Sequence, residues 1–146
     1  MSSLDEISIR VESASGNIRP LLHEIRHALN RVAEGQEGTV IDLRSLPLAP
    51  GEDERIETIL GTGELRAELD ALGPSVVQET SYAGVWLVTH RNTEGEIVAR
   101  FIEVTRTPDI LRSQQADIEL ALGKLEYELD AGGETTVTTL TTPATG

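Results

Sequence analysis

Residues 84–90, with the sequence GVWLVTH, are apolar at both alternating sets of positions. Because the side chains of a strand point alternately to opposite faces, this segment needs cover on both faces and is expected at the centre of a sheet. Residues 75–80 and 96–104 are also predicted strands, and the loop RNTEG before the second of them is typical of a hairpin. Residues 64–69 alternate as a strand does, although they also suit a helix, and we predict a strand.

A long amphipathic helix is predicted ahead of these strands, over residues 18–33. Its apolar side chains recur at three- and four-residue spacings. Ser15 or Asn17 can cap its start, and Gly35 is expected to end it. Residues 39–43 follow as a short strand rich in β-branched side chains.

Two further helices are predicted, one short and one long. Residues 52–60 begin with acidic side chains, which suit the positive end of the helix dipole. Residues 108–129 form the second long helix, with Pro108 in its first turn. Its apolar stripe consists of Leu111, Ile118, Ala121, Leu122, Leu125 and Leu129.

These elements predict an α+β fold: an antiparallel β-sheet of about four to five strands, with two long helices on one face and one short helix. Residues 17–131 are expected to form a single domain. Residues 1–16 are an N-terminal segment with a candidate edge strand, and the Thr-rich residues 132–146 are expected to be disordered. The second face of the sheet is left to solvent or a partner, and we expect a homodimer that uses the sheet or its edge.

Charge and composition narrow the function classes. The 146 residues carry 12 basic and 25 acidic side chains, for a formal net charge of −13. Nucleic acids and anionic membrane surfaces prefer the opposite charge, so neither is expected as a partner. The absence of cysteine excludes thiolate metal sites, and the lone pair Gly61 and Gly63 is too little for a nucleotide loop, so no cofactor is expected. We expect no membrane insertion and a cytoplasmic location, because the sequence has neither a long apolar run nor a signal-peptide pattern.

His23, Glu24 and His27 form the motif H-E-x-x-H on the first predicted helix. In zinc peptidases this spacing places two imidazoles on one helical face, and the glutamate acts as a base on a zinc-bound water. A catalytic zinc needs a third protein ligand, which no extension of the motif supplies, and the two histidines lie opposite the apolar stripe. We therefore expect no catalytic residues and no metal site. His23 and His27 remain weak candidates for metal ligands, and a small zinc-dependent hydrolase remains the alternative function.

The candidate partner-binding residues lie in three places: the polar face of the first helix, the connection SLPLAPGE, and the central strand. The prolines of the connection predict an ordered, turn-like segment. The tryptophan of the central strand is expected in the core or on a sheet face, and would anchor an interface if it faced outward. The acidic side chains of the short helix are expected to form a solvated face. The candidates are His23, His27, Leu46, Pro47, Pro50, Glu52 and Trp86.

Four segments in order carry a resemblance to a known family: NIRPLLHEIRHAL, TVIDLRSLPLAPGE, LGTGELRAEL and ETSYAGVWLVTHRNTEGEIVARFIEVTRTPDILRSQ. They resemble the HupH/HyaF hydrogenase expression proteins over about residues 17–118. The resemblance implies a non-catalytic accessory role in the maturation of nickel–iron uptake hydrogenase. It also implies that the hydrogenase small subunit or another maturation factor is the partner. Members of this family are longer, with a second region of comparable size.

Overall fold

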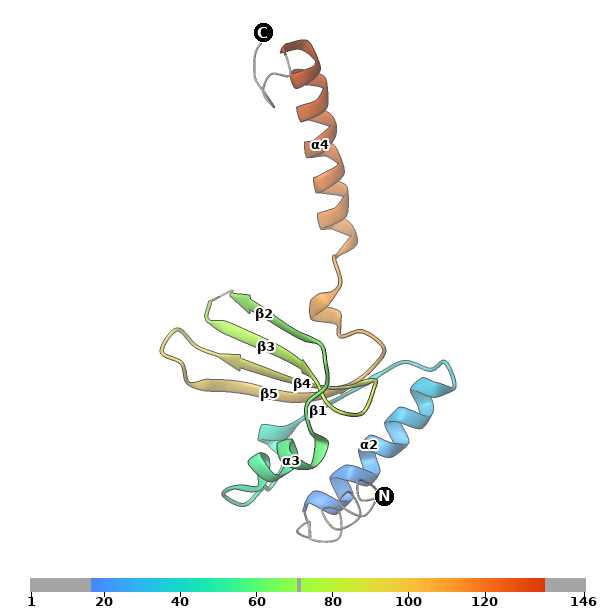
Figure 1. The fold of residues 1–146 in the computed structure, drawn as a ribbon, viewed down its shortest axis with the longest axis vertical. Helices are drawn as coiled ribbons and strands as arrows, with labels where there is room; N and C mark the ends of the chain where they lie inside the picture. Colours follow the sequence, from blue (N-terminus) through green and yellow to red (C-terminus); the bar gives the residue numbers. More distant parts are fainter. Residues whose placement is uncertain (1–16, 71, 136–146) are drawn as a thin grey trace. The chain divides into compact units, whose positions relative to one another are not determined.

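The computed structural model describes residues 17–70 and 72–135 and is drawn in Figure 1. These residues fall into two compact units, one that ends at Pro108 and one that begins at Asp109, and each is described by itself. In chain order the elements are α2 (Ile18–Ala33), β1 (Thr39–Asp42), the 3₁₀ turn η1 (Leu43–Ser45), α3 (Glu52–Leu60), β2 (Arg66–Asp70), β3 (Pro74–Glu79), β4 (Val85–Arg91), β5 (Ile97–Val104), the 3₁₀ turn η2 (Asp109–Leu111) and α4 (Gln115–Thr135).

The first unit is built on a five-stranded antiparallel sheet in the order β1-β5-β4-β3-β2. β4 lies at the centre, as its apolar pattern on both faces predicts. Its Val85 is paired with Val104 of β5, and its Val88 is paired with Val77 of β3. The ambiguous segment at residues 64–69 contains most of β2, which confirms the prediction of a strand there. The predicted α+β fold with an antiparallel sheet is confirmed.

One face of the sheet is covered by α2 and α3, which both lie below the sheet in Figure 1. Both helices have the bounds that the sequence predicts. Their apolar side chains meet those of β1, β4 and β5 in one buried cluster, so this face holds the main core of the unit. The cluster consists of Ile18, Leu21, Ile25, Ala28, Val32, Ile41, Leu43, Ile56, Ile59, Leu60, Val85, Ile102 and Val104.

The second face of the sheet carries a smaller apolar cluster, made of the buried Val77, Trp86 and Val88 with the half-buried Ala67, Leu69 and Phe101 around them. Trp86 is 5% exposed, and its indole N–H donates a hydrogen bond to the carbonyl oxygen of Thr105 at 3.0 Å. The expectation that this face is open is therefore wrong at its centre. The core placement expected for Trp86 is confirmed, and as a buried side chain Trp86 does not belong to the surface offered to a partner.

The second long helix begins later than the sequence predicts. The Thr-Pro-Asp signal at residues 107–109 leads into the 3₁₀ turn η2, and α4 begins only at Gln115 and continues through Gly132 to Thr135. The stripe residues Ile118, Leu122 and Leu125 are each at least half exposed. The expectation that this helix packs on the same sheet face as α2 stays a prediction, because α4 belongs to the second unit.

The ends of the chain are described in part. Residues 1–16, where we expect an edge strand, lie outside the described residues, as do residues 136–146 of the Thr-rich tail. Residues 132–135 of that tail are helical. Within the described part of the chain, none of the helices has the length and apolar character that crossing a membrane requires.

Candidate functional site

The connection between η1 and α3 is held in one conformation by its own backbone and by α2. The N–H of Leu48 donates to the carbonyl oxygen of Leu46 at 2.8 Å. The side-chain amide of Asn17 donates to the carbonyl oxygen of Pro47 at 3.0 Å. Asn17 stands at the N-cap position of α2, but its side chain makes no capping hydrogen bond, and Ser15, the other candidate cap, lies outside the described residues. The side chain of Asn17 fastens the loop to the helix instead, which confirms that the connection is ordered.

Glu52 closes the connection onto the first turn of α3. Its side-chain Oε1 accepts a hydrogen bond from the N–H of Ala49 at 2.8 Å, and its own N–H donates to the carbonyl oxygen of Ala49 at 3.0 Å. The glutamate side chain thus satisfies a backbone N–H three residues before it, and the second bond is a backbone turn bond that closes the loop ahead of the helix. Glu52 is only 6% exposed, so the expectation that all acids of this helix form a solvated face is wrong for it.

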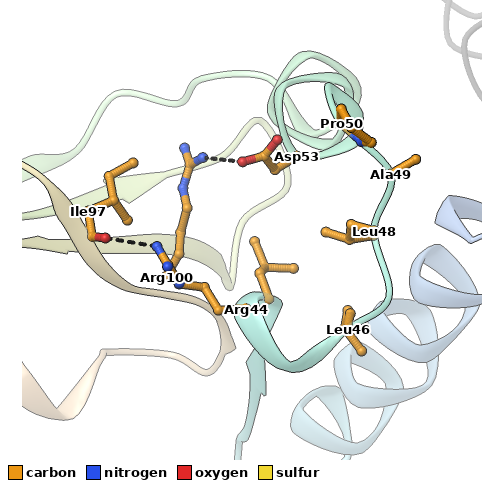
Figure 2. A pocket seen from close by; sticks show the side chains of 9 residues that line it. Arg44, Leu46, Leu48, Ala49, Pro50, Asp53, Ile97 and Arg100 are labelled. Atoms are coloured by element: carbon orange, nitrogen blue, oxygen red, sulfur yellow. Dashed lines mark hydrogen bonds and ion pairs between the residues drawn. The ribbon is translucent and has the colours of Figure 1, made fainter.

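The ordered connection forms one wall of a surface pocket of about 360 Å³, here called the loop pocket, which Figure 2 shows from close by. Leu46, Leu48 and Pro50 follow one another along this wall in the figure. Ile97 and Arg100 of β5 form the opposite side. The pocket is lined by Leu43, Arg44, Leu46, Leu48, Ala49, Pro50, Asp53, Ile97 and Arg100. An apolar wall therefore faces two guanidinium groups.

Arg100 is a charged side chain on the core face of β5, two positions before the buried Ile102. Its side chain is 11% exposed, and its Nη1 lies 3.6 Å from Oδ2 of Asp53, while its Nη2 contacts the carboxylate of Glu57. Its Nε is buried and has no hydrogen-bond partner among the described residues. Burial lowers the pKa of Arg100, and the negative charges of Asp53 and Glu54 act in the opposite direction. The acids of α3 thus offset the cost of burying this cation.

The double variant Asp53→Asn, Glu57→Gln is expected to lower the free energy of unfolding by about 2 kcal/mol, because it removes both carboxylates that pair with the guanidinium of Arg100 and leaves only the charge of Glu54 acting on it. The loss is smaller than for a fully buried ion pair, since both carboxylates are more than 40% exposed and partly screened by water. Urea denaturation followed by circular dichroism measures the change. Adding Arg100→Met, which removes the unpaired charge, should recover most of the stability; a loss that persists in this triple variant would contradict the charge argument.

The H-E-x-x-H motif lies on α2, away from the loop pocket. His23, Glu24 and His27 are all exposed, as the helical wheel predicts. The residues that the structure describes contain no group of three or more His, Asp or Glu side chains placed to hold a metal ion. His23 instead lines an apolar groove between α2 and α3, described below.

The structure separates the predicted site residues. Leu46 and Pro50 line the loop pocket, Pro47 supports it through its carbonyl oxygen, and Glu52 is buried behind it. Leu48 lies in the connection that the sequence singles out, although it is not among the named candidates, whereas sequence reasoning missed Arg44, Asp53, Ile97 and Arg100. For the last of these a signal was present: in the strand pattern of residues 96–104, Arg100 occupies the same alternating set as Ile102 and Val104, and a charge at inward positions predicts a paired, functional or structural side chain.

The fold and the pocket define a small α+β protein module with a five-stranded antiparallel sheet, two helices on one face, and a loop-lined pocket beside the sheet. The model of the HupH hydrogenase expression protein C-terminal conserved region matches residues 16–131. The chain therefore belongs to the HupH hydrogenase expression protein family, which confirms the resemblance seen in the sequence.

The relatives agree with this assignment. The chain is 34% identical over 92 residues to the hydrogenase expression/formation protein HoxQ of Azotobacter vinelandii, covering 63% of this chain and 32% of that protein. It is 26% identical over 101 residues to HupH of Rhizobium leguminosarum bv. viciae, covering 69% and 36%. A solved structure of hydrogenase expression protein HupH from Thiobacillus denitrificans ATCC 25259 is 39% identical with a TM-score of 0.75, covering 80% of this chain and 98% of that one. The chain spans about a third of the length of these curated relatives.

Proposed function

We propose that this chain is a non-catalytic accessory factor in the maturation of nickel–iron uptake hydrogenase and that it acts in the cytoplasm. Membership of the HupH family carries the proposal, because the relatives are named as hydrogenase expression/formation proteins. The likeness to nearly the whole of one solved HupH chain supports a role for this region as a unit. No observation on the described residues favours the alternative of a zinc-dependent hydrolase.

The loop pocket is the surface on which we expect the partner, the hydrogenase small subunit or another maturation factor, to bind. Its chemistry supports this: Leu46, Leu48 and Pro50 offer apolar contact, and the guanidinium of Arg44 stands at the rim. Such a pocket suits an apolar side chain of the partner with a neighbouring carbonyl or carboxylate oxygen directed at Arg44. Because the loop is already fixed by hydrogen bonds to Asn17 and Glu52, binding orders little further backbone.

The variant Arg44→Glu tests this surface with little risk to the fold, because Arg44 is exposed. In a host that makes nickel–iron hydrogenase, the tagged wild-type chain is expected to capture a hydrogenase subunit or a factor needed for its assembly, identified by mass spectrometry. Arg44→Glu should reduce this capture at least about tenfold, since it replaces an attractive charge at the rim by a repulsive one.

Arg91→Glu is the matched control. Arg44 and Arg91 are both exposed, and each donates one hydrogen bond of 2.8 Å to a backbone carbonyl, Arg44 to Ile97 and Arg91 to Gly95. Arg91 does not line the loop pocket, so its variant should capture as the wild type does. Equal loss in both variants would contradict the loop pocket as the docking surface. Failure of the wild-type chain to capture any hydrogenase subunit or assembly factor would contradict the proposed function.

A further inference from the structure

An apolar groove runs along α2 on the side that faces α3. Its volume is about 380 Å³. The buried Ile25, Ile59 and Leu60 lie at its base, and the half-buried Leu22 and Leu29 follow α2 along its length. Leu22 and Leu29 lie two helical turns apart. The groove therefore presents a row of apolar side chains against which the apolar face of another helix could pack.

The rim of this groove is basic, although the chain as a whole carries a net charge of −13. Arg19, His23 and Arg26 line the groove from successive turns of α2, and no acidic side chain lines it. Arg19 and Arg26 are seven residues apart, which on a helix corresponds to about 10 Å. An occupant with an apolar stripe and acidic flanks would therefore match this groove in both chemistry and spacing.

The chain itself carries such an element in α4. Ile118, Leu122, Leu125 and Leu129 recur at spacings of four, three and four residues, which places them on one helical face, and they are 50%, 57%, 57% and 66% exposed. On the helical wheel, Glu119 and Glu126 fall on one side of this stripe, and Asp117 and Glu128 on the other. The stripe is thus apolar, exposed and bordered by acid on both sides.

This charge pattern opposes the simplest way to cover the stripe, which is pairing of α4 with α4 of another copy. In a coiled coil the positions that flank the apolar seam face each other across the two helices. In an antiparallel pair Glu119 and Glu126 would meet each other across the two helices, which is destabilising, and in a parallel pair these acids would face no basic side chain. The acidic flanks favour a basic-rimmed partner surface instead.

We propose that α4 of one chain binds in the α2–α3 groove of a second copy, and that two such contacts related by a two-fold axis hold a homodimer together. The stripe from Ile118 to Leu129 extends about 16 Å, and the groove from Arg19 to Leu29 about 15 Å. The flanking acids of α4 meet Arg19 and Arg26 at the groove rim. Each copy has one groove and one α4, so a reciprocal exchange between two copies fills both grooves and leaves no contact open. The inference does not depend on the proposed function.

The mass of the full chain in solution tests the stripe. Light scattering at micromolar concentration should give twice the chain mass of 15.8 kDa for the wild type. The double variant Leu122→Asp, Leu125→Asp should raise the dimer dissociation constant at least about 100-fold, because this variant places two carboxylates in an apolar groove. The matched control is Leu120→Asp, Tyr127→Asp, on the opposite side of α4, where both side chains are more than 70% exposed. This control should remain dimeric.

A mixing experiment tests the groove and the exchange. Arg19→Glu, Arg26→Glu should be monomeric, whereas Arg31→Glu, on α2 outside the groove, should stay dimeric. The variant Leu122→Asp, Leu125→Asp keeps an intact groove, and the variant Arg19→Glu, Arg26→Glu keeps an intact α4 stripe. When these two variants are mixed, a mixed dimer with one intact contact should form. A monomeric wild type would overturn the proposal, and so would a rim reversal without effect, since α4 would then bind elsewhere. A mixture that forms no dimer while both variants are folded by circular dichroism would equally overturn it.

Discussion

Trp86→Ala is expected to lower the free energy of unfolding by about 3–5 kcal/mol, the range found when a large buried aromatic side chain is truncated. Trp86 is 5% exposed and lies on the central strand, with Val77 and Val88 beside it on the second face of the sheet. Its removal would leave a cavity there and would free the carbonyl oxygen of Thr105 from its indole partner. Urea denaturation followed by far-ultraviolet circular dichroism measures the loss, because the variant has no tryptophan fluorescence.

Trp86→Phe separates the two contributions. It keeps most of the ring volume and loses the indole hydrogen bond with a small part of the packing, so a smaller loss of about 1–2 kcal/mol is expected. A cost below about 1 kcal/mol for Trp86→Ala would mean that the second face is open at its centre, as the sequence led us to expect. Trp86 would then be available to a partner after all.

Gly73→Ala is expected to cost about 2–4 kcal/mol, through backbone strain and overlap together. Gly73 lies in the turn between β2 and β3 and has a φ of +117°, a conformation that side-chain-bearing residues rarely adopt. An added Cβ would also overlap the carbonyl oxygen of Arg91 and the backbone of Asn92, at the start of the next hairpin loop. The thermal unfolding midpoint and urea denaturation both report the loss.

Gly95→Ala is the control that isolates the contribution of backbone strain to the loss of stability. Gly95 has a φ of +86°, but nothing lies within 4 Å of a Cβ added there. In the Gly95→Ala variant the free energy of unfolding should therefore fall only by the strain of a left-handed residue, about 1–2 kcal/mol. If Gly73→Ala costs no more than Gly95→Ala, the close approach of the two hairpin turns does not constrain the sheet.

Local patterns predicted the parts of this fold that depend on short-range chemistry. The bounds of α2 and α3 follow from apolar spacing and from glycine, and the central place of β4 follows from its two apolar faces. The sequence predicts too early a start for the second long helix because Pro108 is a good first-turn residue, whereas the structure buries Pro108 and starts the helix at Gln115. Burial of a single proline depends on distant parts of the fold, which local patterns do not contain.

The candidate site was harder to predict than the fold, because its residues are joined by contacts across long stretches of sequence. Leu46 and Pro50 were predicted from the proline-rich connection alone. The role of Asn17 depends on a carbonyl oxygen thirty residues away, and it replaced the capping role that its local position suggests. Arg100 carried a readable signal, a charge at an inward strand position, but its partners on α3 become evident only when the helix is placed over the sheet.

The strand order also determines when the main core can form during synthesis. β2 to β5 follow one another as hairpins between sequence neighbours, whereas β1 joins the sheet only by pairing with β5, where Thr39 lies opposite Val104. Contacts of this long-range kind form late. The apolar faces of α2 and α3 leave the ribosome before β5 exists, so every nascent chain that ends short of Val104 leaves Ile18 and Ile56 without their full cover. We expect such incomplete chains to bind chaperones that recognise exposed apolar segments, and to need them no longer once the last strand has been made.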